Sequence, residues 1–301
     1  MPVQRHSGRP KLGLALSGGT LKAAAHIGVL SAFEKLGIQP DVLAGTSAGS
    51  LVSVLYAHGY RDDQFRKLLQ TFPGLRLFDY GFPVWSSVYS WTVSHLRQRT
   101  SGTSTIPAVP TGLLRGHKLT RYIERLIEHR QIQIPFYIVA TDLVSGKPIV
   151  FASDQARPSD AYVQLKDIAR AVTGSCALPG IFSPVVLDGY TLVDGAMRHY
   201  IPVSVLKDAG CDKIIAVNLY RLPANYEPIT LVDVLARSFD ILLRESIDND
   251  IAPGPELYVL EPDLSSVKWR KFAQMTDCVA IGQRLVLERR MELQDFLRSQ
   301  S

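Results

Sequence analysis

A serine held between two glycines is the side chain best placed to do chemistry in this sequence. The stretch GTSAG at 45–49 follows a short apolar run and precedes an apolar, small-residue helix predicted over 50–58. Strand, sharp turn and helix are the setting in which a G-x-S-x-G motif exposes a strained nucleophilic serine. Gly45 and Gly49 lack the Cβ atoms that would stop other chain from approaching closely. We therefore predict that Ser47 is a nucleophile; the alternative is a plain turn that caps a core helix.

A second glycine turn lies one strand–helix unit earlier. SGGT at 17–20 separates a buried strand predicted over 11–16 from a helix predicted over 21–36. Glycines ahead of a helix N-terminus present free N–H groups, which can hold an oxyanion or a phosphate. The turn lacks the G-K-[ST] of a P-loop and the G-x-G-x-x-G of a dinucleotide site. Beside a nucleophilic serine, an oxyanion hole at Gly18 and Gly19 is the better interpretation, and a structural turn is the alternative.

A serine nucleophile also needs a base, and an aspartate is a better candidate here than a histidine. Asp188-Gly189 lies between two short apolar runs, which predicts the turn of a two-residue hairpin. Asp194 stands after the second run, followed by small residues that would let another loop reach its carboxylate. A second turn or a helix cap is the alternative. Of the seven histidines, only His199 follows an acid in the order Ser…Asp…His, and none is compelling. The pattern favours a dyad of Ser47 and Asp194.

The order of the predicted elements favours an α/β fold. Two strand–glycine turn–helix units fall within the first 60 residues, the second strand being predicted over 41–44, which indicates a parallel, doubly wound sheet. Loops at the carboxyl ends of such strands form the site, and both glycine turns lie there. The other expected elements are helices over 61–69, 116–130, 165–176, 226–250 and 276–297, strands over 133–141 and 147–152, and paired strands over 185–187 and 191–193.

The stretch 72–112 interrupts this pattern. It is rich in aromatic residues and then, over 100–112, in Ser, Thr, Gly and Pro. The Ser/Thr/Gly/Pro tract is expected to be mobile, and the stretch could form a lid or a flap that contacts a membrane, although local packing of the rings is the better interpretation. The aromatic residues are Phe78, Tyr80, Phe82, Trp85, Tyr89 and Trp91.

Composition sets the class of protein. The 301 residues are 46% hydrophobic and 20% charged, with a net charge of +5. Such a balance suits an anionic substrate or a membrane surface, although a solvated basic face is the better explanation of it, and no nucleic-acid motif is present. The three widely spaced cysteines, with no Cys/His cluster, predict buried reduced thiols, no metal and a cytoplasmic protein. No apolar run is long enough to span a membrane, so any membrane contact is expected to be peripheral.

Five segments, in their order and spacing, resemble those of the bacterial patatin-like phospholipases, which are serine acyl hydrolases with a Ser-Asp dyad. The resemblance covers nearly the whole chain, and it implies a single 1–301 domain with a three-layer α/β/α fold and a mainly parallel central sheet. The segments are LSGGTLKAAAHIGVL at 16–30, GTSAG at 45–49, ATDLVSGKPIVF at 140–151, SCALPGIFSPV at 175–185 and VDGAMRHYIPV at 193–203.

The resemblance also implies roles for residues. Ser47 would be the nucleophile and Asp194 the general base, in the hydrolysis of a phospholipid, lysophospholipid or other fatty-acyl ester without a cofactor. The oxyanion hole would consist of backbone N–H groups along the glycine turn, at Gly18, Gly19, Thr20, Leu21 and Lys22.

The sequence departs from the family pattern at four positions. Thr20 and Ala23 stand where the family usually has glycine, Lys22 where it usually has arginine, and Tyr200 where asparagine is frequent. A β-branched residue resists positive φ, so a loop that needs this conformation at Thr20 would be distorted. Two alternatives stay open. A G-x-S-x-G after a second strand is also found in acyltransferases of related architecture, which would take the acyl group from a thioester, and the substitutions at Thr20 and Ala23 suggest a degenerate family member that binds lipid or a partner.

Overall fold

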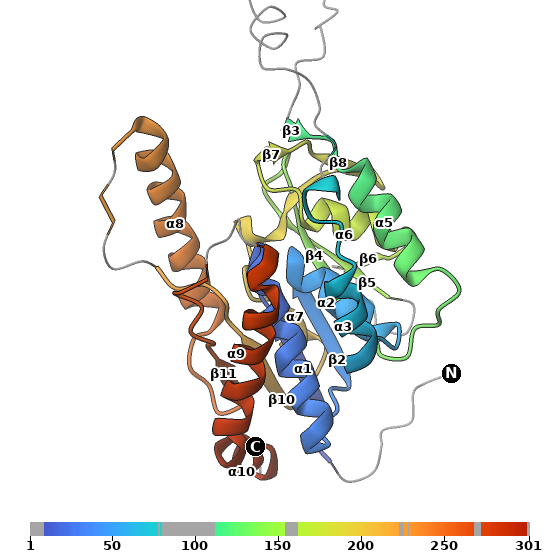
Figure 1. Ribbon diagram of the computed structural model, residues 1–301, viewed down its shortest axis with the longest axis vertical. Helices are drawn as coiled ribbons and strands as arrows, with labels where there is room; N and C mark the ends of the chain where they lie inside the picture. The colour runs from blue at the N-terminus through green and yellow to red at the C-terminus, as the bar shows by residue number, and fades with distance from the viewer. Residues whose placement is uncertain are drawn as a thin grey trace, which may run out of the picture.

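A computed structural model of the chain describes residues 9–77, 79, 112–153, 162–222, 226–227, 229–267 and 272–299. The main sheet of this described part has nine strands, along the path β11-β10-β1-β2-β4-β5-β6, with β9 joined to β4 and β8 to β9 (Figure 1). The strands are β1 Leu12–Leu16, β2 Val42–Thr46, β4 Phe136–Asp142, β5 Pro148–Ala152, β6 Val163–Gln164, β8 Val185–Leu187, β9 Tyr190–Asp194, β10 Lys213–Val217 and β11 Leu257–Leu260.

The centre of this sheet is parallel, as the sequence predicts. β11, β10, β1, β2 and β4 all run in one direction, and β5 and β9 pair with β4 in the antiparallel sense. The carboxyl ends of β1 and β2, where the two glycine turns begin, therefore lie side by side. This edge of the sheet carries the candidate site.

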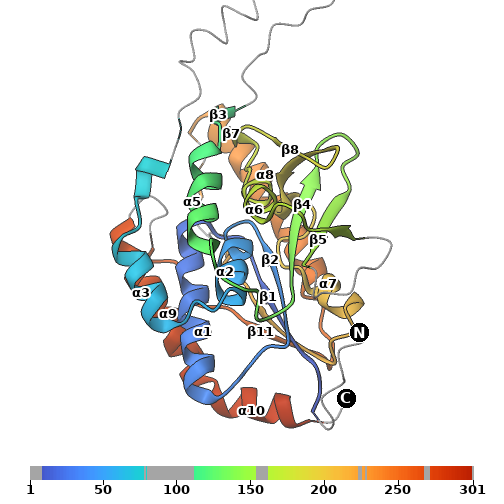
Figure 2. The ribbon, with the colours of Figure 1, turned by 90° about the vertical axis from the view of Figure 1, so that its right-hand side faces the viewer.

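Helices cover both faces of the sheet. Alternate side chains of β1 point to opposite sides, Leu14 and Leu16 into one apolar core and Ala15 into the other. Figure 2 shows α1 and α2 on one side of the strands and α7 on the other. The three-layer α/β/α prediction is confirmed. The helices are η1 Thr20–Ala23, α1 Ala24–Leu36, α2 Ala48–Ala57, α3 Asp62–Gln70, η2 Gly74–Leu77, α5 His117–Ile127, α6 Ile168–Ser175, η3 Gly195–Met197, α7 Val203–Asp208, α8 Leu231–Asp250, η4 Phe272–Gln274, α9 Met275–Glu288 and α10 Arg290–Arg298.

Helix α1 is held in place by a close crossing with α9. A Cβ at Gly28 would lie 2.0 Å from the carbonyl oxygen of Val279, and one at Gly282 would lie 2.2 Å from that of Ala25. The two backbones therefore touch directly, which only glycine permits. The crossing fixes the helix that follows the first glycine turn.

Most local predictions are confirmed within a few residues, with three corrections. The helix predicted over 226–250 begins only at Leu231, after its N-cap Thr230. The Asp188-Gly189 hairpin joins β8 to β9, and its two turn residues have φ of 48° and 85°, as a two-residue turn with both φ values positive requires. The single helix predicted over 276–297 is wrong, because the chain bends at Arg289 and separates α9 from α10. Cys211 and Cys278 are buried free thiols, but Cys176 is only half-buried.

The predicted lid falls mostly outside the described residues, since 78 and 80–111 are not among them. Its described ends are η2 and the short strand β3 Gly112–Leu114, which pairs with β7 Gly180–Phe182 in a second, two-stranded sheet. Among the described residues, no helix combines the length and the hydrophobicity needed to cross a bilayer.

Candidate active site

The register of strand β4 brings the two predicted catalytic residues together. Thr46, the last residue of β2, pairs with Val139, and Asp194, the last residue of β9, pairs with the adjacent Ala140. Both strands lie on the same edge of β4, because β5 occupies the other edge over these residues. β2 and β9 therefore end head to head. Ser47, which follows Thr46, meets Asp194 across this junction.

Ser47 has the geometry of a nucleophile elbow. Its φ is 53°, which is strained for a residue with a side chain, and it is the N-cap of α2. A Cβ at Gly45 would lie 2.5 Å from the carbonyl oxygen of Gly49, and a Cβ at Gly49 would lie 2.4 Å from that of Leu16. Both glycines of the motif are needed for close approach, as predicted. The Ser47 hydroxyl donates a 2.8 Å hydrogen bond to Asp194 Oδ2.

Asp194 is a buried carboxylate with few partners. Its side chain accepts from the Ser47 hydroxyl and, through Oδ1, from the backbone N–H of Ala196 at 2.9 Å. Burial raises its pKa to about 6, against the lesser opposing effects of these two hydrogen bonds. A base whose pKa lies near neutrality accepts a proton from an alcohol more readily than an ordinary carboxylate does.

No histidine among the described residues bonds to this pair. The His199 ring bonds through Nδ1 to Asp250 at 2.9 Å, and the second oxygen of Asp250 accepts from the N–H of Ile201. Only the backbone of His199 approaches the elbow, where its carbonyl accepts from Thr46 Oγ1. Among the described residues, Ser47 and Asp194 are paired without a histidine, as the predicted dyad requires.

Ser175 is a supporting residue that was not singled out in the sequence. Its hydroxyl accepts from the backbone N–H of Ser47 at 2.8 Å and donates to the carbonyl of Val139 at 2.6 Å. The elbow is thereby tied to β4 at the junction of the two strands. The only sequence signal for Ser175 is its position as the first residue of the 175–185 segment that resembles the patatin-like family.

The first glycine turn lies against the nucleophile. A Cβ at Gly18 would be 3.5 Å from Ser47 Cβ. Two of the five predicted oxyanion donors already have partners, because the N–H of Gly18 bonds to the carbonyl of Tyr200 and that of Lys22 to the carbonyl of Gly19. The amides of Gly19, Thr20 and Leu21 make no hydrogen bond with the described part of the chain.

The sequence of this chain matches a known protein family and several of its members. The family model for patatin-like phospholipases matches residues 14–207, which include both glycine turns, Ser47 and Asp194. The chain belongs to this family. An uncharacterised NTE family protein of Mycobacterium tuberculosis is 31% identical over 219 residues, 71% of this chain and 51% of that protein. Lysophospholipase NTE1 of Mycosarcoma maydis is 29% identical over 259 residues, 85% of this chain and 12% of that protein.

The chain thus spans about half the length of the mycobacterial relative and a small part of the fungal one. Among solved structures, human GIVD cytosolic phospholipase A2 aligns over 99% of this chain and 60% of that chain, with 14% identity and a TM-score of 0.45. VipD from Legionella pneumophila aligns over 93% and 67%, with 14% identity and a TM-score of 0.46.

The departures from the patatin-like pattern have structural consequences. Thr20 adopts a φ of 49°, so the loop does need positive φ where the family usually has glycine. The ring of Tyr200 packs on the glycine turn, since a Cβ at Gly18 would lie 2.9 Å from its Cε2 atom. Tyr200 therefore supports this turn, while the Ala196 amide supports Asp194.

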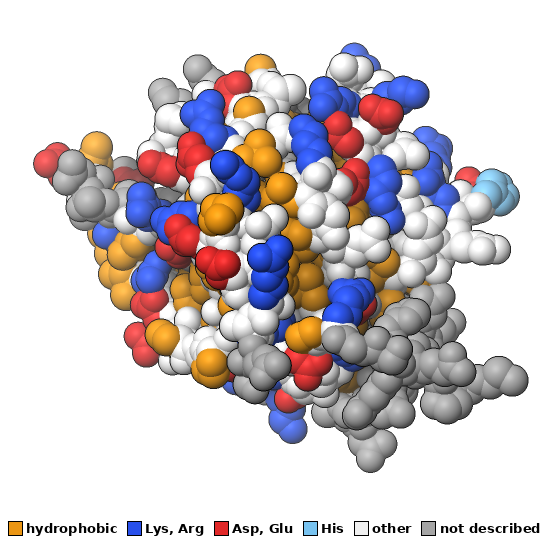
Figure 3. All heavy atoms as spheres, turned by 90° about the horizontal axis from the view of Figure 1, so that it is seen from below, with side chains coloured by type: hydrophobic (Ala, Val, Ile, Leu, Met, Phe, Trp, Pro, Cys, Tyr) orange, Lys and Arg blue, Asp and Glu red, His pale blue; other side chains and the backbone are white. Residues whose placement is uncertain are grey.

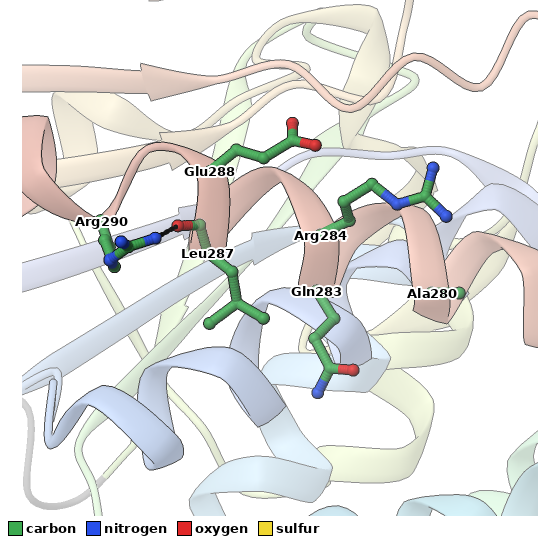
Figure 4. Close-up of a pocket in the computed structure, with 6 residues that line it drawn as sticks. All are labelled: Ala280, Gln283, Arg284, Leu287, Glu288 and Arg290. Atoms are coloured by element: carbon green, nitrogen blue, oxygen red, sulfur yellow. Dashed lines mark hydrogen bonds between the residues drawn. The ribbon is translucent and has the colours of Figure 1, made fainter.

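Two hollows elsewhere on the surface do not contain the dyad. One, of about 450 Å³, lies along α9 and the start of α10, and its side chains are charged or polar apart from Ala280 and Leu287 (Figure 4). The other, of about 420 Å³, lies between α8, η3 and α7 and includes His199 and Asp250. Among the described residues that line them, no hydrogen bond joins a hydroxyl to a carboxylate or an imidazole. Within the described residues, no three His, Cys, Asp or Glu side chains are grouped so that they could hold a metal ion.

Proposed function

We propose that this chain is a lipid acyl hydrolase of the phospholipase A or lysophospholipase type that uses Ser47 as its nucleophile. The observation that carries the proposal is the 2.8 Å hydrogen bond from the strained Ser47 hydroxyl to the buried Asp194 carboxylate. Membership of the patatin-like phospholipase family and the similarity to lysophospholipase NTE1 support the choice of a fatty-acyl ester as substrate.

The reaction has two halves. Ser47 Oγ attacks the ester carbonyl while Asp194 Oδ2 takes its proton, and the protonated Asp194 then gives that proton to the leaving alcohol as the acyl-enzyme forms. A water molecule attacks the acyl-enzyme, Asp194 accepts its proton, and the fatty acid leaves as Ser47 regains its hydrogen. The amides of Gly19, Thr20 and Leu21 would hold the oxyanion in both halves. Loss of one such donor typically costs ~2.7–4 kcal/mol of transition-state stabilisation.

The experiment is a hydrolysis panel of phosphatidylcholine, lysophosphatidylcholine and p-nitrophenyl acyl esters, with Ser47→Ala as the control. We expect release of fatty acid by the natural chain and a loss of at least about 10³-fold in Ser47→Ala. A fluorophosphonate probe should label Ser47. Absence of an adduct would favour the lipid-binding alternative, and an adduct with exchange into a thiol ester but without hydrolysis would favour the acyltransferase.

We also propose that the lipid is taken from a membrane surface at the carboxyl edge of the sheet. Most large apolar side chains that are exposed in the described residues lie on elements at this end: Leu143, Val144, Ile181, Val186, Met197, Ile229, Leu231, Val234, Leu235, Ile241 and Leu242. The last five occupy a sector of about 120° on α8, at 100° per residue. In Figure 1 the N-terminal half of α8 projects at the upper left, toward the same end of the molecule as β7 and β8 but apart from them.

Of the large exposed apolar side chains in the described residues, only Met291 lies toward the opposite end of the molecule. Figure 3, seen from the end at which β1 and β2 begin, shows basic and acidic side chains interspersed with hydrophobic ones. The exposed Met291 of α10 lies toward that end and is 61% exposed, as is Leu235 on α8. Leu235→Ser should therefore weaken sedimentation with phosphatidylcholine vesicles, while Met291→Ser should not. Equal binding of both variants would contradict the proposal. A change in oligomeric state confined to Leu235→Ser would also contradict it, and would indicate that a second copy of the chain packs on α8.

A further inference from the structure

A histidine in α1 bonds to the strand end from which the glycine turn begins. His26 is completely buried, and its Nε2 lies 2.9 Å from the carbonyl oxygen of Ser17. A carbonyl oxygen can only accept, so Nε2 must carry the hydrogen. The sequence suggested a satisfied core histidine, but only one of its two nitrogens has a partner.

The other nitrogen, Nδ1, is buried without a hydrogen-bond partner in the described part of the chain. Burial lowers the pKa of His26 to about 4, so the ring is neutral at ordinary pH and offers one donor. An apolar side chain would fill the same space without leaving a buried polar atom unpaired. What the histidine adds over an apolar side chain is therefore the hydrogen bond to Ser17.

That bond is one of several that fix successive peptide planes of the turn. The Ser17 carbonyl points to His26, and the N–H of Gly18, on the opposite side of the same peptide, points to the carbonyl of Tyr200 at 3.2 Å. In the next peptide, the Gly18 carbonyl accepts from Ser17 Oγ at 2.9 Å. The N–H of Gly19 is therefore turned away from Ser17 Oγ. It is the first amide in the turn without a partner among the described residues.

The Ser17 carbonyl also contacts the nucleophile elbow. A Cβ at Gly49 would lie 2.4 Å from the Ser17 carbonyl oxygen, which therefore sits between His26 and the start of α2. Rotation of the Ser17–Gly18 peptide would move the oxyanion donors and would press on the elbow. The hydrogen bond from His26 therefore restrains both the oxyanion donors and the elbow.

We propose that His26 is a positioning residue, which aims the oxyanion amides of the glycine turn by holding the Ser17 carbonyl. The proposal rests on the hydrolase function proposed above. His26 touches neither Ser47 nor Asp194 through any hydrogen bond in the described chain, so its effect is expected on kcat rather than on KM.

The test compares two amide variants. In His26→Gln the side-chain nitrogen occupies nearly the place of Nε2 and can still reach the carbonyl, whereas the shorter His26→Asn cannot. A displacement of catalytic groups by ~1 Å can cost about 10²-fold in rate. We expect kcat of His26→Asn to fall 10- to 100-fold with KM within two-fold, and His26→Gln to recover most of the loss.

His58 provides a matched control. It is also buried, and its Nδ1 bonds to a carbonyl, but that carbonyl belongs to Val54 of its own helix. His58→Gln should lower stability while leaving kcat within two-fold. If it lowers kcat as much as His26→Asn does, the effect comes from loss of stability and the proposal is wrong.

Two further readouts separate positioning from folding. A trifluoromethyl ketone, whose adduct with Ser47 needs the oxyanion hole, should bind His26→Asn more weakly by the same factor as the loss in kcat/KM. A fatty amide, which forms no adduct, should bind equally. In the natural chain, ¹⁵N NMR should show the Nε2–H tautomer of His26, whether or not the chain is active. The proposal would be overturned by a charged ring, by an Nδ1–H tautomer, or by full kcat in His26→Asn. An inactive natural chain whose His26 is the Nε2–H tautomer would contradict only the hydrolase function.

Discussion

Replacing Asp194 by asparagine should abolish activity and at the same time stabilise the fold. The carboxylate is 4% exposed, and burial raises its pKa from the ordinary 3.8 to about 6. Each pKa unit corresponds to ~1.4 kcal/mol, so keeping this group charged costs the folded state up to ~3 kcal/mol above pH 6. Asparagine has the same shape and is neutral. Its oxygen can accept from Ala196 and its amide can donate to Ser47 Oγ, so both hydrogen bonds survive with one reversed.

The sign of the pH dependence follows from the raised pKa. The folded state binds the Asp194 proton more tightly than the unfolded state does. The stabilisation that protonated Asp194 gives to the folded state is therefore fully present below about pH 4. It is lost as the pH rises through about 6. The asparagine variant does not titrate in this window. The two proteins should have similar free energies of unfolding near pH 4, and the variant should be up to ~3 kcal/mol more stable at pH 7.

Urea unfolding followed by circular dichroism, at half-unit steps from pH 4 to pH 8, measures this difference. Asp142→Asn is the control of opposite sign. Hydrogen bonds from the hydroxyl and N–H of Ser145, and from the N–H of Thr191, hold the pKa of Asp142 below its ordinary value. That substitution should destabilise the protein at neutral pH, with a smaller loss as the pH falls. The reasoning is refuted if Asp194→Asn is less stable than the natural chain at pH 7, or if the difference does not change between pH 4 and pH 6.

The raised pKa of Asp194 predicts that log kcat/KM rises with unit slope up to about pH 6 and is flat above it. At pH 5, kcat/KM should be roughly ten-fold lower than on the plateau. A midpoint near pH 4 would show that Asp194 is not the titrating base. His199→Ala should keep esterase activity within about five-fold, because His199 bonds to Asp250 and not to the dyad; a dead variant would indicate a triad. Thr20→Gly removes strain at a φ of 49°, so its free energy of unfolding in urea should be unchanged or up to ~1 kcal/mol higher, and a clear loss would show that the threonine side chain stabilises the turn. Gly49→Ala should destabilise the fold and abolish labelling of Ser47 by a fluorophosphonate, since its Cβ would lie 2.4 Å from the Leu16 and Ser17 carbonyl oxygens; normal labelling would contradict this packing.

The sequence alone carries the features that depend on near neighbours in the chain. Gly45 and Gly49 predict the elbow because close approach excludes any Cβ, and Asp188-Gly189 predicts the hairpin because both of its residues must adopt positive φ. Apolar runs and turns locate β1 and β2 within one or two residues. The break at Arg289 escaped prediction, since apolar residues continue on both sides of it and no glycine or proline marks it.

Tertiary structure decided the features that depend on distant segments. Ser47 and Asp194 are 147 residues apart, and they meet because β2 and β9 end at adjacent positions on one edge of β4, a register that no local pattern contains. Which amides of the glycine turn are free depends on the Tyr200 carbonyl, and the orientation of the turn depends on His26. The pKa of Asp194 depends on burial, which exists only once the helices have packed on the sheet. The sequence thus singled out the two candidate catalytic side chains, and long-range packing set the distance between them, their hydrogen-bond partners and the pKa of the carboxylate.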